Sequence, residues 1–170
     1  MGYTIAICDD DKNMADKLTV SLKNEFMKAG RNDVIIDYYD TGVQLLETLK
    51  NKMYKAVLLD INMEPMDGFS VAEAIGKSGY RTKIIFVTSH EDVVYDTFDY
   101  TPFYFIRKSR YETYVQRVVK KLIAIDGYEK TIVLDDKDGI ININSGDITY
   151  VHSEDHYLTV HTACLLYTSP

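Results

Sequence analysis

Charged and hydroxyl side chains end four separate apolar stretches of this sequence. The residues at these ends are Asp9, Asp10, Asp11, Asp60, Thr88, Ser89, Arg107 and Lys108. In an open parallel sheet, ligands bind outside the carboxyl ends of the strands, so polar residues at strand ends are the first to consider. We therefore predict one shared site that contains several carboxylates, a hydroxyl group and a cation.

The chemistry of such a set is restricted by electrostatics. Clustered carboxylates raise one another's pKa values unless a cation offsets their repulsion, and hard oxygen ligands at this density suit Mg²⁺. Mg²⁺ together with a lysine ammonium group is also what phosphoryl transfer requires. A carboxylate can accept the phosphoryl group as an aspartyl phosphate. Asp60, which follows apolar residues and is central in the expected sheet, is the best-placed acceptor.

The elements that must position these residues alternate between short apolar runs and longer amphipathic stretches. Strands are predicted at residues 3–8, 34–39, 56–60, 83–88 and 103–106. Helices are indicated by apolar residues at helical spacing from Met14 to Phe26, by residues 43–49 and 69–77, and by capping boxes at Ser89/Asp92 and Ser109/Glu112. This pattern predicts a doubly wound α/β fold with a five-stranded parallel sheet and five helices. Asp11 is expected only to cap the first helix.

The pattern changes near Asp126-Gly127. Short β-type runs at residues 132–134, 139–143, 148–151 and 157–160 are separated by Asp, Gly, Asn and Ser, which predicts a second, all-β unit. We divide the chain at this point into residues 1–126 and 127–170.

Charge and composition exclude several classes of protein. The net charge is -7, and residues 129–170 hold two lysines against seven acidic residues, so this segment is not expected to bind DNA as it stands. No apolar run is long enough for a membrane span, and no signal peptide is recognised, so we predict a cytoplasmic protein without a membrane partner. A disulfide between Cys8 and Cys164 is not expected.

The motifs at the strand ends resemble the receiver domain of two-component response regulators over residues 3–125. The motifs are Ile7-Cys8-Asp9-Asp10-Asp11, Leu58-Leu59-Asp60-Ile61-Asn62-Met63, Met66-Asp67-Gly68, Val87-Thr88-Ser89 and Phe105-Ile106-Arg107-Lys108. The resemblance implies a flavodoxin-like fold with strand order 2-1-3-4-5, a sensor histidine kinase as partner, and a homodimer that forms on phosphorylation.

The same resemblance implies a role for each site residue. Asp60 would be phosphorylated and would bind Mg²⁺ with Asp9, Asp10 and the backbone carbonyl of Asn62. Thr88 and Lys108 would bind phosphoryl oxygens, and Phe105 would be the aromatic switch residue. Phe105 stands where many relatives have Tyr, so it offers no hydroxyl group. Ser109 stands where many have Pro, so we expect a trans peptide after Lys108.

From Glu129 onward the chain resembles the opening of a LytTR-type DNA-binding domain, in the stretch from Ile148 to Thr162. This implies an incomplete all-β domain, with DNA as a partner of a longer protein but not of this chain. The segment from Cys164 to Pro170 resembles a translated adapter, and residues from about Cys164 are expected not to be native.

The leading hypothesis is a transcriptional response regulator that is not an enzyme beyond its self-catalysed phosphorylation. A stand-alone receiver that acts as a phosphate sink or interaction switch is the alternative. A Mg²⁺-dependent phosphatase with an Asp nucleophile would need an Asp where Asn62 stands, and a flavodoxin-like electron carrier would need a Thr/Ser-Gly phosphate loop after the first strand.

Two further groups of residues, one of histidines and one of aromatic residues, each allow two interpretations. His152, His156 and His161 could suggest zinc, although no further ligand completes a tetrahedral set, so β structure is favoured. The aromatic residues Tyr95, Phe98, Tyr100, Phe103 and Tyr104 fit a core and a dimer face equally.

Overall fold

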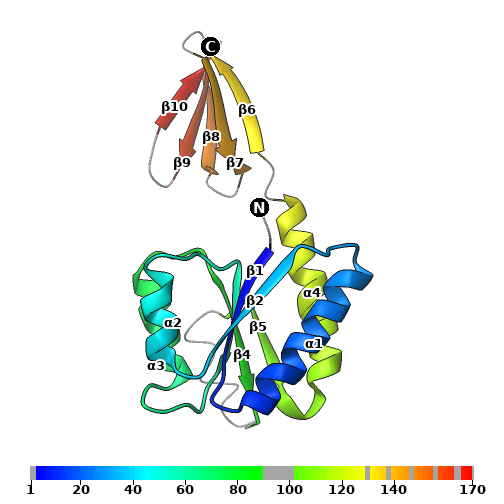
Figure 1. Cartoon of the computed structure of the whole chain (residues 1–170). Coiled ribbons are helices and arrows are strands. Elements are labelled where there is room, and N and C mark those ends of the chain that lie inside the picture. Colours follow the sequence, from blue (N-terminus) through cyan, green and yellow to red (C-terminus); the bar gives the residue numbers. More distant parts are fainter. Residues whose placement is uncertain are drawn as a thin grey trace. The chain divides into compact units, whose positions relative to one another are not determined.

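Five parallel strands form one sheet in the N-terminal part of the chain. This computed structural model describes residues 3–89, 102–128, 131–136, 139–145, 148–154, 157–162 and 166–169 (Figure 1). The chain divides into two compact units, Met1–Val119 and Lys120–Pro170. The strands of the first unit are β1 (Tyr3–Cys8), β2 (Val34–Tyr39), β3 (Ala56–Asp60), β4 (Lys83–Thr88) and β5 (Tyr104–Arg107). Their order, β2-β1-β3-β4-β5, confirms the predicted doubly wound topology, and β5 lies one residue later than predicted.

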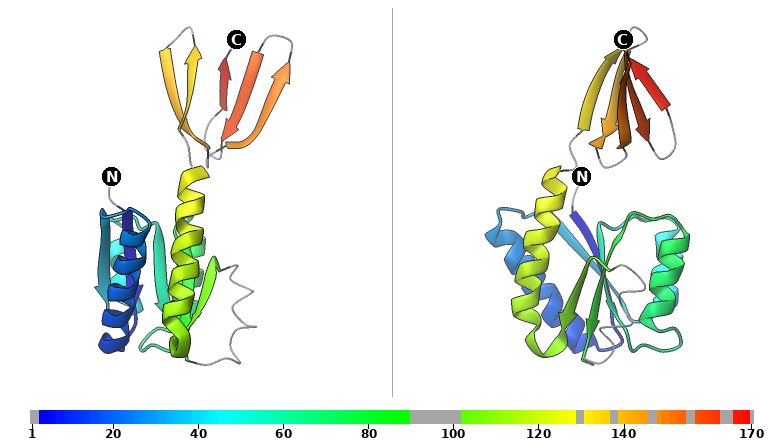
Figure 2. Two further views of the ribbon diagram at one scale, coloured as in Figure 1. Left: turned by 90° about the vertical axis from the view of Figure 1, so that its right-hand side faces the viewer. Right: turned by 180° about the vertical axis from the view of Figure 1, so that it is seen from behind.

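Helices cover both faces of this sheet. They are α1 (Lys12–Lys28), α2 (Gly42–Leu49), α3 (Gly68–Lys77) and α4 (Tyr111–Tyr128), the last preceded by a 3-10 turn, η3 (Lys108–Arg110). α2 and α3 lie on one face, and α1 and the start of α4 lie on the other (Figures 1 and 2). The helix expected from Ser89, with most of the aromatic group around Tyr95, falls in residues 90–101, outside the described part of the chain.

The first helix shows how local sequence sets the element boundaries. The Asp11 carboxylate accepts hydrogen bonds from the N–H groups of Asn13 (3.0 Å) and Met14 (3.2 Å), which confirms its predicted role as the helix cap. Gly30 follows the helix with φ +78°, a conformation that favours glycine. The buried stripe of α1 contains Met14, Ala15, Leu18, Leu22 and Phe26. This stripe orients α1 on the sheet.

The core lies between the sheet and its two helix layers. Every residue of β3 is buried, as expected for a central strand that is covered on both faces. The face toward α2 and α3 carries a cluster that includes Leu45, Val57, Val71, Ile75 and Phe86. Asp60, the last residue of β3, is thus a carboxylate at the end of a fully buried strand.

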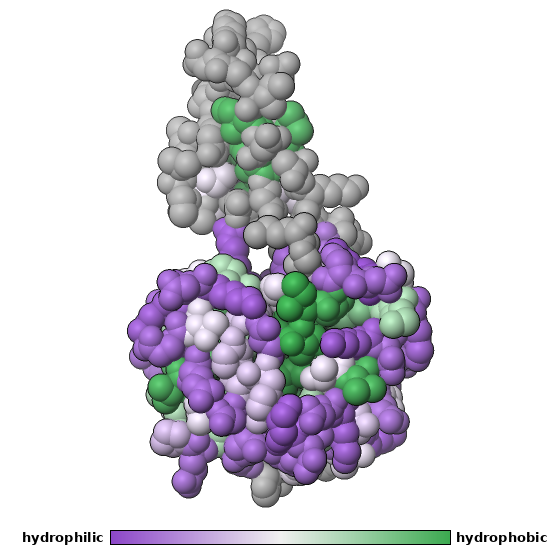
Figure 3. Space-filling model, viewed as in Figure 1, coloured by the Kyte–Doolittle hydropathy of each residue, from purple (hydrophilic) through white to green (hydrophobic). Residues whose placement is uncertain are grey.

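The outer surface of the first unit is mostly hydrophilic on the face shown in Figure 3, with an apolar stretch beside β2 and α1. Exposed apolar side chains of these two elements include Val20, Met27 and Ile35. Within the described residues, no helix is long and apolar enough to cross a membrane.

A polar cluster fastens β2 to the loop before β3. Tyr54 donates a short hydrogen bond to Asp37, and Lys52 pairs with the same carboxylate at 2.5 Å. The hydroxyl groups of Tyr39 and Tyr54 lie 2.6 Å apart. Partial burial alone would raise the pKa of Asp37, but the hydrogen bonds from Lys52 and Tyr54 lower it on balance. The cluster therefore stabilises the fold most when Asp37 is ionised.

We expect Asp37→Asn to lower the free energy of unfolding at neutral pH by about 1 kcal/mol, because the pair is partly exposed and screened by water. The folded pKa of Asp37 lies below its ordinary value of 3.8, so this contribution is complete above that value and is lost as the pH falls through the folded pKa. Urea unfolding of parent and variant across the acid range measures it. Glu47→Gln is the control, since Glu47 and Lys50 form a pair that is more exposed than the pair of Asp37 and Lys52. A difference that persists in acid would contradict the assignment.

The second unit is built from antiparallel strands. β6 (Thr131–Asp136) pairs with β7 (Gly139–Asn144), and β8 (Ile148–Glu154), β9 (Tyr157–Thr162) and β10 (Leu166–Ser169) form a sheet in the order β10-β9-β8. The first four strands confirm the predicted β-type runs. The strand at β10 was not predicted, and it forms because β9 offers an edge of unpaired backbone groups on the side away from β8.

Candidate functional site

Three carboxylates converge at the carboxyl edge of the first sheet. Asp9 follows β1, Asp60 ends β3, and the two strands are hydrogen-bonded neighbours. Asp9, Asp10 and Asp60 each offer a carboxylate oxygen, and these oxygens all lie within 4.8 Å of one another. Asp9 and Asp60 are only 1% and 4% exposed, whereas Asp10 is exposed. The site therefore has a buried floor and an open acidic rim.

Lys108 bridges the two buried acids. Its Nζ lies 2.9 Å from Oδ2 of Asp60 and 3.1 Å from Oδ1 of Asp9. The lysine follows β5, which lies two strands away from β3 in the sheet. Because its side chain is mostly buried, the ammonium group neutralises part of a charge that water cannot reach.

The backbone and one side chain hold Asp9 rigidly. Its N–H donates to the carbonyl oxygen of Tyr39 (3.1 Å), and its own carbonyl accepts a hydrogen bond from the Tyr38 hydroxyl (3.0 Å). Oδ1 also accepts from the N–H of Asp11 at 2.9 Å. Oδ2 is buried and lacks a hydrogen bond with good geometry, although it lies 2.9 Å from Nζ of Lys108. This oxygen therefore pairs with the lysine by charge, and it still has lone pairs that no hydrogen bond uses.

Burial dominates the electrostatics of the acids. It raises the pKa of Asp60 to about 6, although the hydrogen bond from Lys108 opposes the rise and the Asp9 charge adds to it. Burial likewise raises the pKa of Asp9, again opposed by Lys108. Burial alone would lower the pKa of Lys108, but its hydrogen bonds to both acids raise it on balance. The lysine therefore stays charged.

The donor set fits Mg²⁺. It consists of carboxylate oxygens with an exposed member, and Mg²⁺ prefers hard oxygen ligands and keeps several of its waters. Within this set, the buried Oδ2 of Asp9 accepts no hydrogen bond, so its lone pairs are open to a metal ligand bond. A metal site needs several acids, histidines or cysteines close together, and among the described residues only Asp9, Asp10 and Asp60 meet this condition. Neither His152 nor His161 belongs to such a cluster. His156 lies outside the described residues.

The other predicted site residues are Thr88 at the end of β4, Asn62 after β3, and Phe105 within β5. Thr88 is buried at the end of β4, one position beyond Val87, the register partner of Asp60. The side chain of Asn62 is exposed, and a hydrogen bond involving its backbone lowers the pKa of Asp60. Phe105 is partly buried against the core cluster on the α2 and α3 face.

A peptide bond and a buried thiol near the site complete its description, and the peptide bears on the departure noted at Ser109. Among the described residues the cis peptide is Glu64-Pro65, so the bond after Lys108 is trans, as predicted. Cys8 is a buried free thiol whose pKa is raised to about 12 by burial and by nearby Asp9 and Asp60. It is therefore not nucleophilic near neutral pH.

Sequence reasoning missed two residues of the site. Tyr38 carries the hydroxyl that holds the Asp9 backbone, and no local pattern distinguishes it from any other strand tyrosine. Gly68 was recognised only as part of a motif, but it lies directly against the backbone of Asp60. A glycine at the first position of a helix was the available signal.

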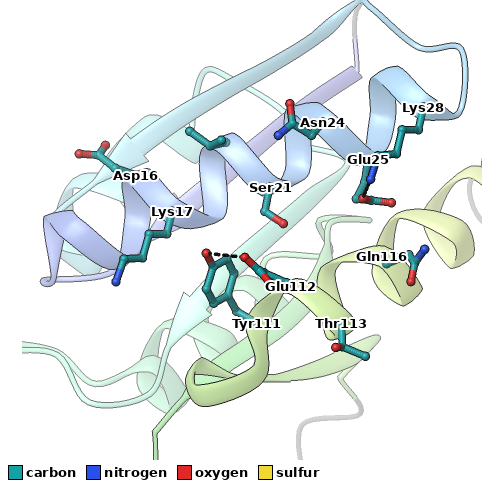
Figure 4. A pocket seen from close by; sticks show the side chains of 11 residues that line it. Asp16, Lys17, Ser21, Asn24, Glu25, Lys28, Tyr111, Glu112, Thr113 and Gln116 are labelled. Carbon is teal, nitrogen blue, oxygen red and sulfur yellow. Dashed lines mark hydrogen bonds and ion pairs between the residues drawn. The ribbon is translucent and has the colours of Figure 1, made fainter.

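A separate hollow of about 680 Å³ lies between α1 and the start of α4 (Figure 4). Its walls carry both signs of charge, with Asp16, Lys17 and Glu25 from α1 and Glu112 from α4. The figure shows Tyr111 and Glu112, at the start of α4, hydrogen-bonded to each other. None of the carboxylates of the cluster lines it.

Comparisons with known proteins agree with the fold of the first unit. The model of the family described as "Response regulator receiver domain" matches residues 5–120. The chain is 28% identical over 90 residues to the transcriptional regulatory protein YpdB of Escherichia coli, which covers 53% of this chain and 37% of YpdB. It is 22% identical over 178 residues to the sensory transduction protein LytT of Bacillus subtilis, covering 96% of this chain and 70% of LytT. The chain thus spans well under half the length of YpdB.

Solved structures show the same fold. The response regulatory domain of MrkE from Klebsiella pneumoniae has a TM-score of 0.64 at 22% identity, over 72% of this chain and 96% of that one. The response regulator TrrA from Thermotoga maritima, solved in complex with Mg²⁺-BeF, has a TM-score of 0.59 at 29% identity, over 72% and 99% of the two chains.

Proposed function

The chain belongs to the response regulator receiver family, and from this premise we propose that it takes a phosphoryl group on Asp60. The observation that carries the proposal is a nearly buried carboxylate that ends the central strand, beside two further carboxylates and a lysine that contacts it. This is the arrangement that an anionic acceptor and a transferred anion both require.

We propose that Asp9, Asp10, Asp60 and the backbone carbonyl of Asn62 hold Mg²⁺. The lone pairs of the Asp9 Oδ2 that no hydrogen bond uses and the Mg²⁺-BeF complex of TrrA support this proposal. Bound Mg²⁺ would neutralise charge on the phosphoryl oxygens. The remaining chemistry lies with the chain itself.

In the proposed step, a carboxylate oxygen of Asp60 attacks phosphorus. A new O–P bond forms while the bond from phosphorus to the donor breaks, and the electron pair leaves with the donor. Lys108, which pairs with Oδ2 of Asp60 before transfer, would then bind a phosphoryl oxygen. Thr88 would donate a hydrogen bond from its hydroxyl group to another phosphoryl oxygen. The ring of Phe105 would respond to the movement of Thr88.

We propose a sensor histidine kinase as the natural donor, and a homodimer as the product of phosphorylation. Residues 127–170, which lie within the second unit, would be the first part of a LytTR-type DNA-binding domain. The alignment with LytT extends over this unit, and YpdB carries a name that refers to transcription. The longer protein would regulate transcription by binding DNA.

The decisive experiment incubates the purified chain with acetyl phosphate and follows intact mass with and without Mg²⁺. Addition of one phosphoryl group that depends on Mg²⁺ and maps to Asp60 is the expected result. A chain that gains no phosphoryl group under any Mg²⁺ concentration would refute the proposal.

Thr88→Ala and Lys108→Ala are expected to retain some phosphorylation of Asp60 but to lose the response to it, because both side chains bind the phosphoryl group and do not attack it. Lys108→Ala should also lower the melting temperature, since it leaves Asp9 and Asp60 buried without their cation. The measurement is the phosphorylation-dependent NMR shift of the Phe105 ring.

The matched controls are Thr82→Ala, a buried threonine before β4, and Lys23→Ala, an exposed lysine of α1. Both should respond as the parent does. If the Thr88 and Lys108 variants also show the full shift at Phe105, the proposed relay is wrong.

A further inference from the structure

Gly68, the first residue of α3, lies against the backbone of Asp60. A Cβ atom at this position would lie 2.2 Å from the carbonyl oxygen of Asp60 and 2.9 Å from Cα of Ile61. These are distances that real Cβ atoms essentially never show, and the obstacle is backbone, which cannot rotate away. Gly68 is not among the positive-φ glycines, Gly30 and Gly79, so the requirement here is for space.

The same contact closes the loop that follows β3. The N–H of Gly68 donates to the carbonyl oxygen of Ile61 at 2.9 Å, so residues 61–68 form a loop whose two ends are joined. That loop contains Asn62, whose carbonyl is a proposed Mg²⁺ ligand. The start of α3 therefore determines where both Asp60 and the Asn62 backbone lie.

We propose that Gly68 is a positioning residue for phosphoryl transfer, because its missing side chain allows α3 to begin against the backbone of the acceptor. This inference rests on the proposed function. Any side chain must push the backbone of Asp60 or the start of α3 by ~1 Å, and a misplacement of that size can reduce a rate by ~100-fold. Because Gly68 has no side chain, it would not contact the phosphoryl group and would act only through the position of the Asp60 backbone.

Three glycine variants of the full chain separate positioning from general packing. Gly76→Ala lies in the same helix, where an added Cβ meets nothing within 4 Å. At Gly42, an added Cβ would lie 2.3 Å from Cγ2 of Val71, which crowds α3 with no contact to Asp60. Gly42→Ala thus crowds α3 through one of its side chains, without the contact to the backbone of the acceptor.

The measurements are melting temperature, Mg²⁺ affinity by calorimetry, and the rate of labelling by acetyl phosphate at saturating Mg²⁺ and donor. Gly68→Ala is expected to label ~10- to 100-fold more slowly than the parent even at saturation. Gly76→Ala should match the parent in rate. Gly42→Ala should melt earlier but label, per folded molecule, at close to the parent rate.

A second pair decides the matter if Gly68→Ala does not fold. Asp67 caps α3 by accepting a hydrogen bond from the N–H of Ser70 at 2.7 Å. Asp67→Ala loosens the first turn, which contains Gly68, whereas Asp67→Asn keeps a good cap and removes the charge. Slower saturated labelling in Asp67→Ala, with a parent-like rate in Asp67→Asn, would support the proposal.

Two results would overturn it. One is a Gly68→Ala or Asp67→Ala chain that labels at the parent rate, and the other is a Gly42→Ala chain that slows as much as Gly68→Ala. A parent chain that takes no phosphoryl group would instead refute the proposed function itself, so the two failures are distinguishable.

Discussion

Asp60→Asn is expected to abolish acyl phosphate formation while leaving the fold intact. An amide is a poor nucleophile although it has nearly the same shape as the carboxylate. The fold should tolerate the change because burial disfavours the charged carboxylate, as its pKa of about 6 indicates, and an amide carries no charge to bury. Stability at neutral pH should therefore be equal to or greater than that of the parent.

Intact mass after incubation with acetyl phosphate and Mg²⁺ measures this effect, and circular dichroism checks the fold. Asp33→Asn, a change at an exposed acid just before β2, is the control and should label fully. Labelling of the Asp60 variant at the parent rate would show that another residue is the acceptor. Peptide mapping of the labelled chain would then identify it.

Asp10→Ala is expected to weaken Mg²⁺ binding by ~10- to 100-fold or more, because even the loss of groups that only support metal ligands has effects of that size. Asp10 is the exposed member of the cluster, so its removal creates no cavity. Without Mg²⁺ the variant should be as stable as the parent or slightly more stable, since one of three mutually repelling charges is gone.

Calorimetric titration with Mg²⁺ and thermal melts with and without Mg²⁺ measure the two effects. Mg²⁺ should raise the melting temperature of the parent much more than that of Asp10→Ala. Asp16→Ala, at an exposed acid of α1 that pairs with Lys12, should behave as the parent in Mg²⁺ binding. An unchanged Mg²⁺ affinity in Asp10→Ala would remove Asp10 from the site.

Both experiments test a site whose members the sequence identified before any contact was known. Apolar runs of strand length and amphipathic stretches of helix length predicted the elements, because periodicity is a local property of the chain. The rule that strand ends share one edge then grouped Asp9, Asp10, Asp60, Thr88 and Lys108. The strand order followed from the resemblance of these motifs to the receiver family.

What the sequence could not determine is how each acid differs from the others. Asp9 and Asp10 are neighbours in the chain, but Asp9 is buried and held by Tyr38 and Tyr39 from β2, whereas Asp10 is exposed. Burial depends on which distant segments cover a residue. The local sequence pattern does not show which distant segments will cover a residue.

The sequence by itself therefore determined the order of the elements and the chemical types at the strand ends, since both follow from local spacing. Only the tertiary structure decided that Lys108 reaches two acids from separate strands, that Gly68 must lack a side chain, and that residues 166–169 pair with β9. Each of these is a contact between segments that are separated in the sequence or that were not predicted to meet. Such contacts depend on the packing of the whole chain, because close packing fixes distances that no local propensity specifies.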